Sequence, residues 1–114
     1  MTPATAMATW TRLCPLEQII PDSGVCVRMA DRQVAVFRLT DDRVFAIDNH
    51  DPFSGANVLS RGIVGDADGV LFVASPIHKQ RFALSDGRCL DGEDISVTPY
   101  RCRVVDGTIE IDLT

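Results

Sequence analysis

The sequence has no hydrophobic run near the roughly 20 residues that are needed to cross a bilayer, and its first residues lack the charged segment of a secretory signal. It also has no run of Lys and Arg, and its formal net charge is −5 with a pI of about 4.8. These absences argue against a membrane span and make nucleic acid or an anionic membrane a poor partner. We therefore expect a cytoplasmic protein.

The four cysteines are widely spaced, and no Cys-x-x-Cys pair occurs. Zinc knuckles and cluster-binding loops usually take ligands that are close in sequence, because a tight turn sets their geometry. Disulfides are rare in a reducing compartment. The sequence therefore predicts four separate thiols, mostly half-buried in strands, at Cys14, Cys26, Cys89 and Cys102.

Alternation of apolar and polar residues dominates most of the chain, and this pattern is typical of strands with one buried face. Turn signals such as Asp106-Gly107 separate these runs, and only the segment from Leu16 to Ile20 suggests a turn of helix. The length of 114 residues fits one domain. We expect residues 1–8 to form a flexible tail and residues 9–114 a single all-β domain. Its predicted architecture is an antiparallel β-sandwich or small barrel of short hairpins with little helix.

Two stretches break the strand pattern, one from Asp48 to Asp68 and one from Ser75 to Gln80. Each follows a hydrophobic strand, and long ordered loops in compact domains tend to be functional. If the preceding strands belong to one sheet, the two loops lie side by side.

The amino-acid sequences of these two loops resemble known motifs. Residues 46–55 read Ala-Ile-Asp-Asn-His-Asp-Pro-Phe-Ser-Gly, and residues 75–82 read Ser-Pro-Ile-His-Lys-Gln-Arg-Phe. Both frames resemble those of Rieske domains, which hold a [2Fe–2S] cluster between a Cys-x-His loop and a Cys-x-x-His loop. The resemblance spans residues 10–113 and implies a Rieske-like fold.

The four ligand positions of this frame have mostly lost their ligands. Asp51 and Ser75 stand at the two cysteine positions, Phe53 stands at one histidine position, and only His78 remains. Iron–sulfur clusters take thiolate or imidazole donors, so three of the four positions fail. His50, Asp51 and His78 have the side-chain types of a two-His, one-carboxylate iron site. However, His50 and Asp51 are adjacent, and neighbouring side chains in an extended chain point to opposite faces. We predict that the chain binds no cluster and no other metal.

A Rieske frame without its ligands resembles the small subunit of assimilatory NAD(P)H nitrite reductase, through residues 51–62 and 75–80. The resemblance implies a non-catalytic subunit that binds and supports a large subunit. It also implies that FAD, a [4Fe–4S] cluster and sirohaem lie in that partner, which reduces nitrite to ammonia in nitrate assimilation. This chain itself would carry no catalytic residue, no cofactor and no NAD(P)H site. Two alternatives stay open: a Rieske-type ferredoxin electron carrier, and a cluster-free adaptor domain in another oxidoreductase complex.

The loop residues divide into inward and outward roles. We expect Asp51 to accept hydrogen bonds from backbone N–H groups of its own loop. We expect Phe53 to fill the space that a cluster would occupy, because a void there is costly. The candidates for contact with the partner are the other residues at the loop tips, namely His50, Pro52, Pro76, Ile77, Lys79 and Gln80.

Overall fold

The structure, a computed structural model, describes residues 9–92 and 94–113, and the expected tail at residues 1–8 lies outside that range. The described part contains nine strands and two short 3-10 helices. The strands are β1 (Trp10–Pro15), β2 (Ser23–Met29), β3 (Arg32–Arg38), β4 (Val44–Asp48), β5 (Ile63–Ala67), β6 (Val70–Ala74), β7 (Arg81–Ala83), β8 (Pro99–Val105) and β9 (Thr108–Asp112). The 3-10 helices are η2 (Leu16–Gln18) and η3 (Leu59–Arg61). None of the helices in this range is long and apolar enough to cross a membrane.

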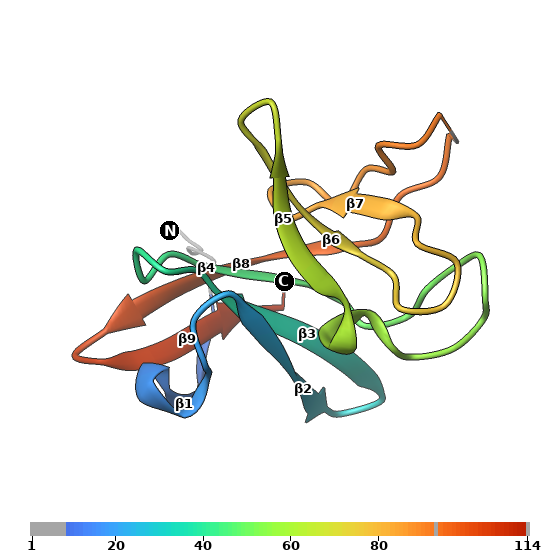
Figure 1. Cartoon of the computed structure of the whole chain (residues 1–114). Helices are drawn as coiled ribbons and strands as arrows, with labels where there is room; N and C mark the ends of the chain where they lie inside the picture. Colours follow the sequence, from blue (N-terminus) through green and yellow to red (C-terminus); the bar gives the residue numbers. More distant parts are fainter. Residues whose placement is uncertain (1–8, 93, 114) are drawn as a thin grey trace, which may run out of the picture.

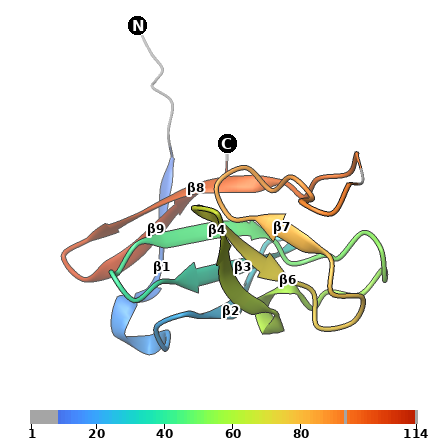
Figure 2. The ribbon, with the colours of Figure 1, turned by 45° about the horizontal axis from the view of Figure 1, so that its top comes forward.

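The strands form two antiparallel sheets. A six-stranded sheet has the order β1-β9-β8-β4-β3-β2, and a three-stranded sheet has the order β5-β6-β7. Figure 1 shows the smaller sheet lying over one side of the larger one, and Figure 2 shows the same arrangement from a second direction. The expectation of an all-β antiparallel fold built from hairpins is confirmed.

Both faces of β3, which lies between β4 and β2 in the six-stranded sheet, are buried. Four consecutive residues of β3, from Val34 to Phe37, are fully buried. The alternation in the sequence suggested one buried face, and for β3 that interpretation was wrong. The reason is that a core lies on each side: Phe37 packs towards the smaller sheet, and Val36 packs with Ile109 of β9 on the other side.

Strand β5 was not predicted. It lies within the stretch from Asp48 to Asp68, which the sequence indicated to be a loop. Gly65 lies opposite Phe72 in the β5–β6 pairing, and a β-carbon on Gly65 would approach the Phe72 ring to 2.6 Å. The glycine therefore belongs to a strand whose partner strand places an aromatic ring over it. Glycine in a strand marks such a close approach as well as a loop.

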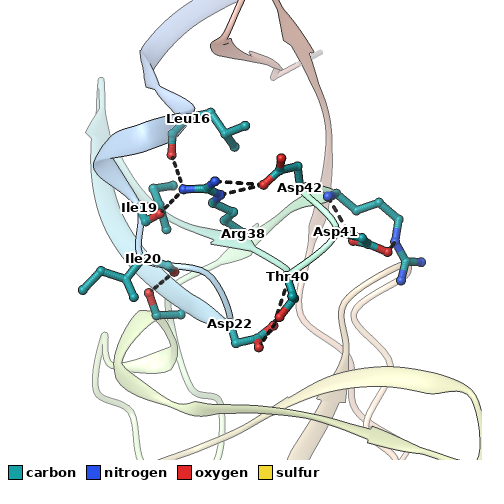
Figure 3. A network of polar contacts seen from close by, with 10 residues as sticks. Leu16, Ile19, Ile20, Asp22, Arg38, Thr40, Asp41 and Asp42 are labelled. Carbon is teal, nitrogen blue, oxygen red and sulfur yellow. Dashed lines mark hydrogen bonds and ion pairs between the residues drawn. The ribbon is translucent and has the colours of Figure 1, made fainter.

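Hydrogen bonds of one side chain, Arg38, hold two connections between strands in place. Nη1 of Arg38 donates to the carbonyl oxygens of Leu16 (3.4 Å) and Ile19 (2.9 Å), and Nε and Nη2 donate to Oδ1 of Asp42 (3.0 and 2.9 Å) (Figure 3). Arg38 thereby fixes the segment around η2 against β3, and this contact keeps Ile19 fully buried in its core.

The turn after β7 depends on Gly87. Its φ is +77°, its N–H donates to the carbonyl oxygen of Ala83 at 2.8 Å, and its own carbonyl accepts from the N–H of Val97 at 2.8 Å. A β-carbon at this position would collide with the carbonyl oxygen of Val97. Glycine is required here both by the positive φ and by the lack of space.

Candidate functional site

The two loops meet at a buried hydrogen bond. The first loop (residues 49–58) follows β4, and the second loop (residues 75–80) follows β6. Oγ of Ser75 donates to Oδ2 of Asp51 at 2.5 Å, and the exposed fractions of these two residues are 1% and 0%. The two positions that hold cysteines in a Rieske frame are therefore joined directly to each other. The loops lie side by side, but the condition named for this was wrong, because β4 and β6 belong to different sheets.

Each loop is also closed by its own backbone. In the first loop the N–H of Gly55 donates to the carbonyl oxygen of Asp51 at 2.8 Å. In the second loop the N–H of Lys79 donates to the carbonyl oxygen of Ser75 at 3.1 Å, and the N–H of Ser75 donates to that of Gln80 at 2.8 Å. Both turns include a residue with positive φ, +79° at Gly55 and +68° at Lys79. The loops are compact turns that present their tips to solvent.

Asp51 is held in its charged form. Burial raises the pKa of Asp51, but the hydrogen bonds from the Ser75 hydroxyl and from the N–H of Phe53 (2.9 Å to Oδ1) lower it, and the net pKa lies below the usual range. The expected backbone bond of Asp51 is thus present. A buried carboxylate stays charged when donors surround it in this way.

The two histidine positions of the frame are occupied differently. Phe53 is half-buried and packs against the core, with its ring centroid 6.0 Å from that of Phe82. His78 is exposed and makes no hydrogen bond to the described residues. One of these positions thus offers no donor atom, and the other points into solvent.

This donor set does not fit a [2Fe–2S] cluster. Such a cluster needs four thiolate or imidazole donors. Here the Asp51 carboxylate is engaged by Ser75, a serine hydroxyl is a poor ligand for iron, and Phe53 has no donor. Within residues 9–92 and 94–113, no three His, Cys, Asp or Glu side chains gather in a way that could hold a metal ion.

The remaining loop residues lie mostly at the surface. His50 is exposed, and its Nδ1 lies 3.0 Å from Oδ1 of Asn57. The exposed tips comprise Pro52, Pro76, Ile77 and Lys79. Gln80 is half-buried, and its Oε1 has no hydrogen-bond partner among the described residues. His50, Asp51 and His78 therefore do not converge.

Asn49 is a site residue that the sequence reasoning missed. It is almost fully buried, its Nδ2 donates to the carbonyl oxygen of Asn57 (3.0 Å) and to Oε1 of Gln33 (3.2 Å), and its Oδ1 accepts from the N–H of Ser60 (2.7 Å). Its amide spans the first loop from end to end. The only signal in the sequence was an Asn directly after a buried strand, where an amide often satisfies loop backbone.

None of the cysteines lies in either loop, but the Sγ of Cys26 accepts a hydrogen bond from Nδ2 of Asn49 at 3.5 Å. All four are free thiols: Cys26 is exposed, and Cys14, Cys89 and Cys102 are half-buried. Burial raises the pKa of Cys102 to about 12, so this thiol stays protonated at neutral pH. The prediction of separate thiols is confirmed for all four.

Comparison with known proteins agrees with the Rieske-like frame of the two loops. Residues 9–112 match the model of the Rieske-like [2Fe–2S] domain family. The nitrite reductase (NADH) small subunit of Escherichia coli K12 is 48% identical over 106 residues, which cover 92% of this chain and 98% of that protein. A crystal structure from Mycobacterium tuberculosis, suggested to be an NADH-dependent nitrite reductase small subunit, is 50% identical with a TM-score of 0.89 and covers 95% of this chain and 97% of the other.

A further relative joins this domain to a longer chain. The nitrite reductase [NAD(P)H] large subunit of Klebsiella oxytoca is 43% identical over 107 residues, which are 94% of this chain but 11% of that protein. The frame of the two loops, the fold and these similarities agree. The chain belongs to the Rieske-like domain family and, within it, to the nitrite reductase small subunits.

Proposed function

We propose that this chain is the non-catalytic small subunit of a cytoplasmic NAD(P)H-dependent nitrite reductase, which reduces nitrite to ammonia in nitrate assimilation. The chain binds and supports a large subunit, and FAD, a [4Fe–4S] cluster and sirohaem belong to that partner. The observation that carries this proposal is the buried hydrogen bond between Ser75 and Asp51. This hydrogen bond lies where a Rieske domain would hold its cluster, so we infer that the chain acts by contact with the large subunit and not by electron transfer.

The relative from Klebsiella oxytoca supports the choice of partner, because there a similar domain is part of a large subunit. Covalent fusion places two domains at high effective concentration, and separate chains with the same pairing must bind each other instead. A ferredoxin role has no support from the donor set, since an electron carrier of this fold needs the cluster.

The tips of the two loops are the proposed contact surface. Ile77 has 47% of its surface exposed, and the only lysine of the chain, Lys79, follows two residues later and is exposed as well. The fully buried core of an interface is apolar and its rim is polar and solvent-accessible, so we assign Ile77 to the core of the contact and Lys79 to its rim. The other proposed contacts are His50, Pro52, Pro76 and Gln80.

The proposal is tested by purifying the large subunit with and without a tagged copy of this chain. We expect a stable complex with sirohaem and flavin absorbance, and a colourless isolated chain after anaerobic purification. Inorganic sulfide in the isolated chain would overturn the proposal. A large subunit that keeps its full stability and nitrite reduction without this chain would overturn it as well.

A matched pair of variants tests the contact surface. Ile77→Ser removes an exposed apolar side chain from the second loop, whereas Ile20→Ser removes a more exposed one (74% against 47%) that is far from both loops in the sequence. We expect Ile77→Ser to weaken the complex about tenfold, and Ile20→Ser to bind as the unmodified chain does. Equal binding by both variants would remove the second loop from the interface.

A further inference from the structure

Strand β5 is an open edge of the three-stranded sheet. Among the described residues it pairs only with β6. Natural proteins usually protect such an edge with Lys, Pro, a bulge or a covering segment, because its free N–H and C=O groups can pair with another strand. The five residues of β5 include no Lys, Arg or Pro, and Ile63 has 69% of its surface exposed.

The other edges are better protected. Strand β1 has a register irregularity between Arg12 and Cys14 and ends at Pro15. The far side of β7 is bridged by Cys89, which pairs with Phe82. Edge strand β2 includes a charged residue, Arg28, and charged side chains are one way to protect an edge. Within the described part of the chain, β5 is thus an edge without a Lys, an Arg, a Pro, a register irregularity or a bridging residue.

The hairpin geometry identifies the backbone groups that point outwards. Asp68 and Gly69 form the two-residue turn between β5 and β6, and both have positive φ (+53° and +87°). In such a turn the flanking residues form a hydrogen-bonded pair, and every second pair follows. The N–H and C=O groups of Val64 and Asp66 therefore point away from β6. Each is free to bond an added strand.

A cavity opens beside this edge. It has a volume of about 510 Å³ and lies between the β5–β6 hairpin and the turn that connects β3 to β4. Its apolar lining comes from Leu39, Val64 and Leu71. Because Val64 lines the cavity and also offers its backbone at the free edge, a segment paired with β5 would place side chains into the cavity.

The rim of the cavity is acidic. Asp22, Asp41 and Asp66 line it together with one cation, Arg43. Arg43 is paired with Asp41 at 2.7 Å, so Asp22 and Asp66 are the rim carboxylates that have no ion pair with any residue the structure describes. Asp22 accepts hydrogen bonds from the N–H and hydroxyl of Thr40 (3.0 and 2.5 Å) (Figure 3).

We propose that the β5 edge binds an extended segment of the large subunit as an added strand, and that a Lys or Arg of this segment enters the acidic cavity beside it. This inference rests on the proposed function, which supplies the partner. Main-chain hydrogen bonds provide affinity in this mode of recognition, and the side-chain pocket provides specificity. The edge is continuous with the second loop, because Ile63 pairs with Ala74, the residue before Ser75.

Charge argues for this occupant over a second copy of the chain. The whole chain has a net charge of −5, and two copies joined through β5 would bring their acidic rims together. Like charges across an interface oppose association. A cationic segment of a partner is favoured by the same two carboxylates.

Hydrogen exchange on the unmodified complex is the first test. On binding the large subunit, the amides of Val64 and Asp66 should exchange more slowly, because they become donors to the added strand. Protection confined to other segments would overturn the inference. This measurement uses the unmodified chain, so it does not depend on whether a variant folds.

Three variants make the test specific. Ile63→Lys places a charge on the open edge and should raise the Kd for the large subunit about tenfold. Ile95→Lys makes the same change at an exposed position outside β5 and should leave the Kd unchanged. Asp66→Asn should raise the Kd about threefold and reduce its dependence on salt.

The outcomes separate this inference from the function on which it rests. If the unmodified chain binds the large subunit and Ile63→Lys binds equally well, only the docking mode is refuted. If the unmodified chain does not bind at all, the proposed function fails and this inference fails with it. If the isolated chain dimerises in sedimentation and Ile63→Lys abolishes the dimer, a second copy is the occupant and the proposal is wrong.

Discussion

The hydrogen bond between Ser75 and Asp51 leads to a quantitative prediction about stability. Ser75→Ala removes the donor at 2.5 Å and leaves the Asp51 carboxylate buried, with the N–H of Phe53 still bonded to its other oxygen. The substitution removes one oxygen atom and little volume. The N–H of Ile77 also loses its acceptor, the Oγ of Ser75 at 3.2 Å. The substitution therefore tests the hydrogen bonds of the Ser75 hydroxyl and not the packing of the loops.

The magnitude follows from the charge of the acceptor. A hydrogen bond to a charged group contributes roughly 1.5–3 kcal/mol, and an unsatisfied buried partner adds to the loss. We expect the free energy of unfolding to fall by about 2 kcal/mol at pH 7. For a domain near 100 residues this corresponds to a drop in Tm of roughly 8–16 °C.

The effect should depend on pH, because the pKa of Asp51 is lowered in the folded chain. A carboxyl with a lowered pKa stabilises the fold fully above its unfolded pKa of about 3.9, and this contribution is lost as the pH falls through the folded pKa. Ser75→Ala removes one cause of the lowering and leaves the effect of burial. The difference between the two proteins should thus be largest above pH 4 and shrink below it.

Urea unfolding followed by the fluorescence of the single tryptophan, Trp10, measures this difference. Ser85→Ala is the matched control, because Ser85 is exposed on the turn after β7. It should change the free energy of unfolding by less than about 0.5 kcal/mol. The reasoning is refuted if Ser75→Ala is as stable as Ser85→Ala at pH 7, or if its loss is the same at pH 7 and pH 3.

Three further predictions concern the scaffold. Arg38→Ala should lower the free energy of unfolding by about 3 kcal/mol in urea, because the segment around η2 loses the donors that hold its carbonyl groups, and Arg38→Lys should restore part of the loss. Gly87→Ala should lower the Tm far more than Gly92→Ala: both positions have positive φ, but only Gly87 lacks room for a β-carbon. Cys102 should resist thiol reagents at pH 8 in the folded chain while the exposed Cys26 reacts, as mass spectrometry of the labelled protein would show.

The sequence was a good guide where local chemistry decides the structure. The hairpin of β8 and β9 followed from Asp106-Gly107, since both residues adopt the positive φ that a two-residue turn needs. The buried faces of β3 were harder to predict. Alternation distinguishes the two faces of a strand, but it does not reveal that the smaller sheet covers one face of β3 while β9 of the same six-stranded sheet packs on the other.

The site was predictable only where local sequence determines it. The positions of Asp51 and Ser75 followed from the frame of the two loops, and the roles of Asp51 and Phe53 followed from their chemistry. The bond between Asp51 and Ser75 depends on the pairing of loops that are 24 residues apart, and no local signal encodes it. Asn49 was missed because its partners come from three separate segments.

The Asp51–Ser75 bond also bears on why a chain without donors would keep the loop frame. In a Rieske domain the iron bound by two cysteines links the loops, so their shape depends on the metal. Here a carboxylate and a hydroxyl make the link, and backbone turns close each loop separately. The conformation of the loop tips therefore follows from the polypeptide alone. A subunit whose role is to be recognised by its partner needs a surface of constant shape, and this arrangement supplies one that changes neither with the iron supply nor with the redox state of a cluster.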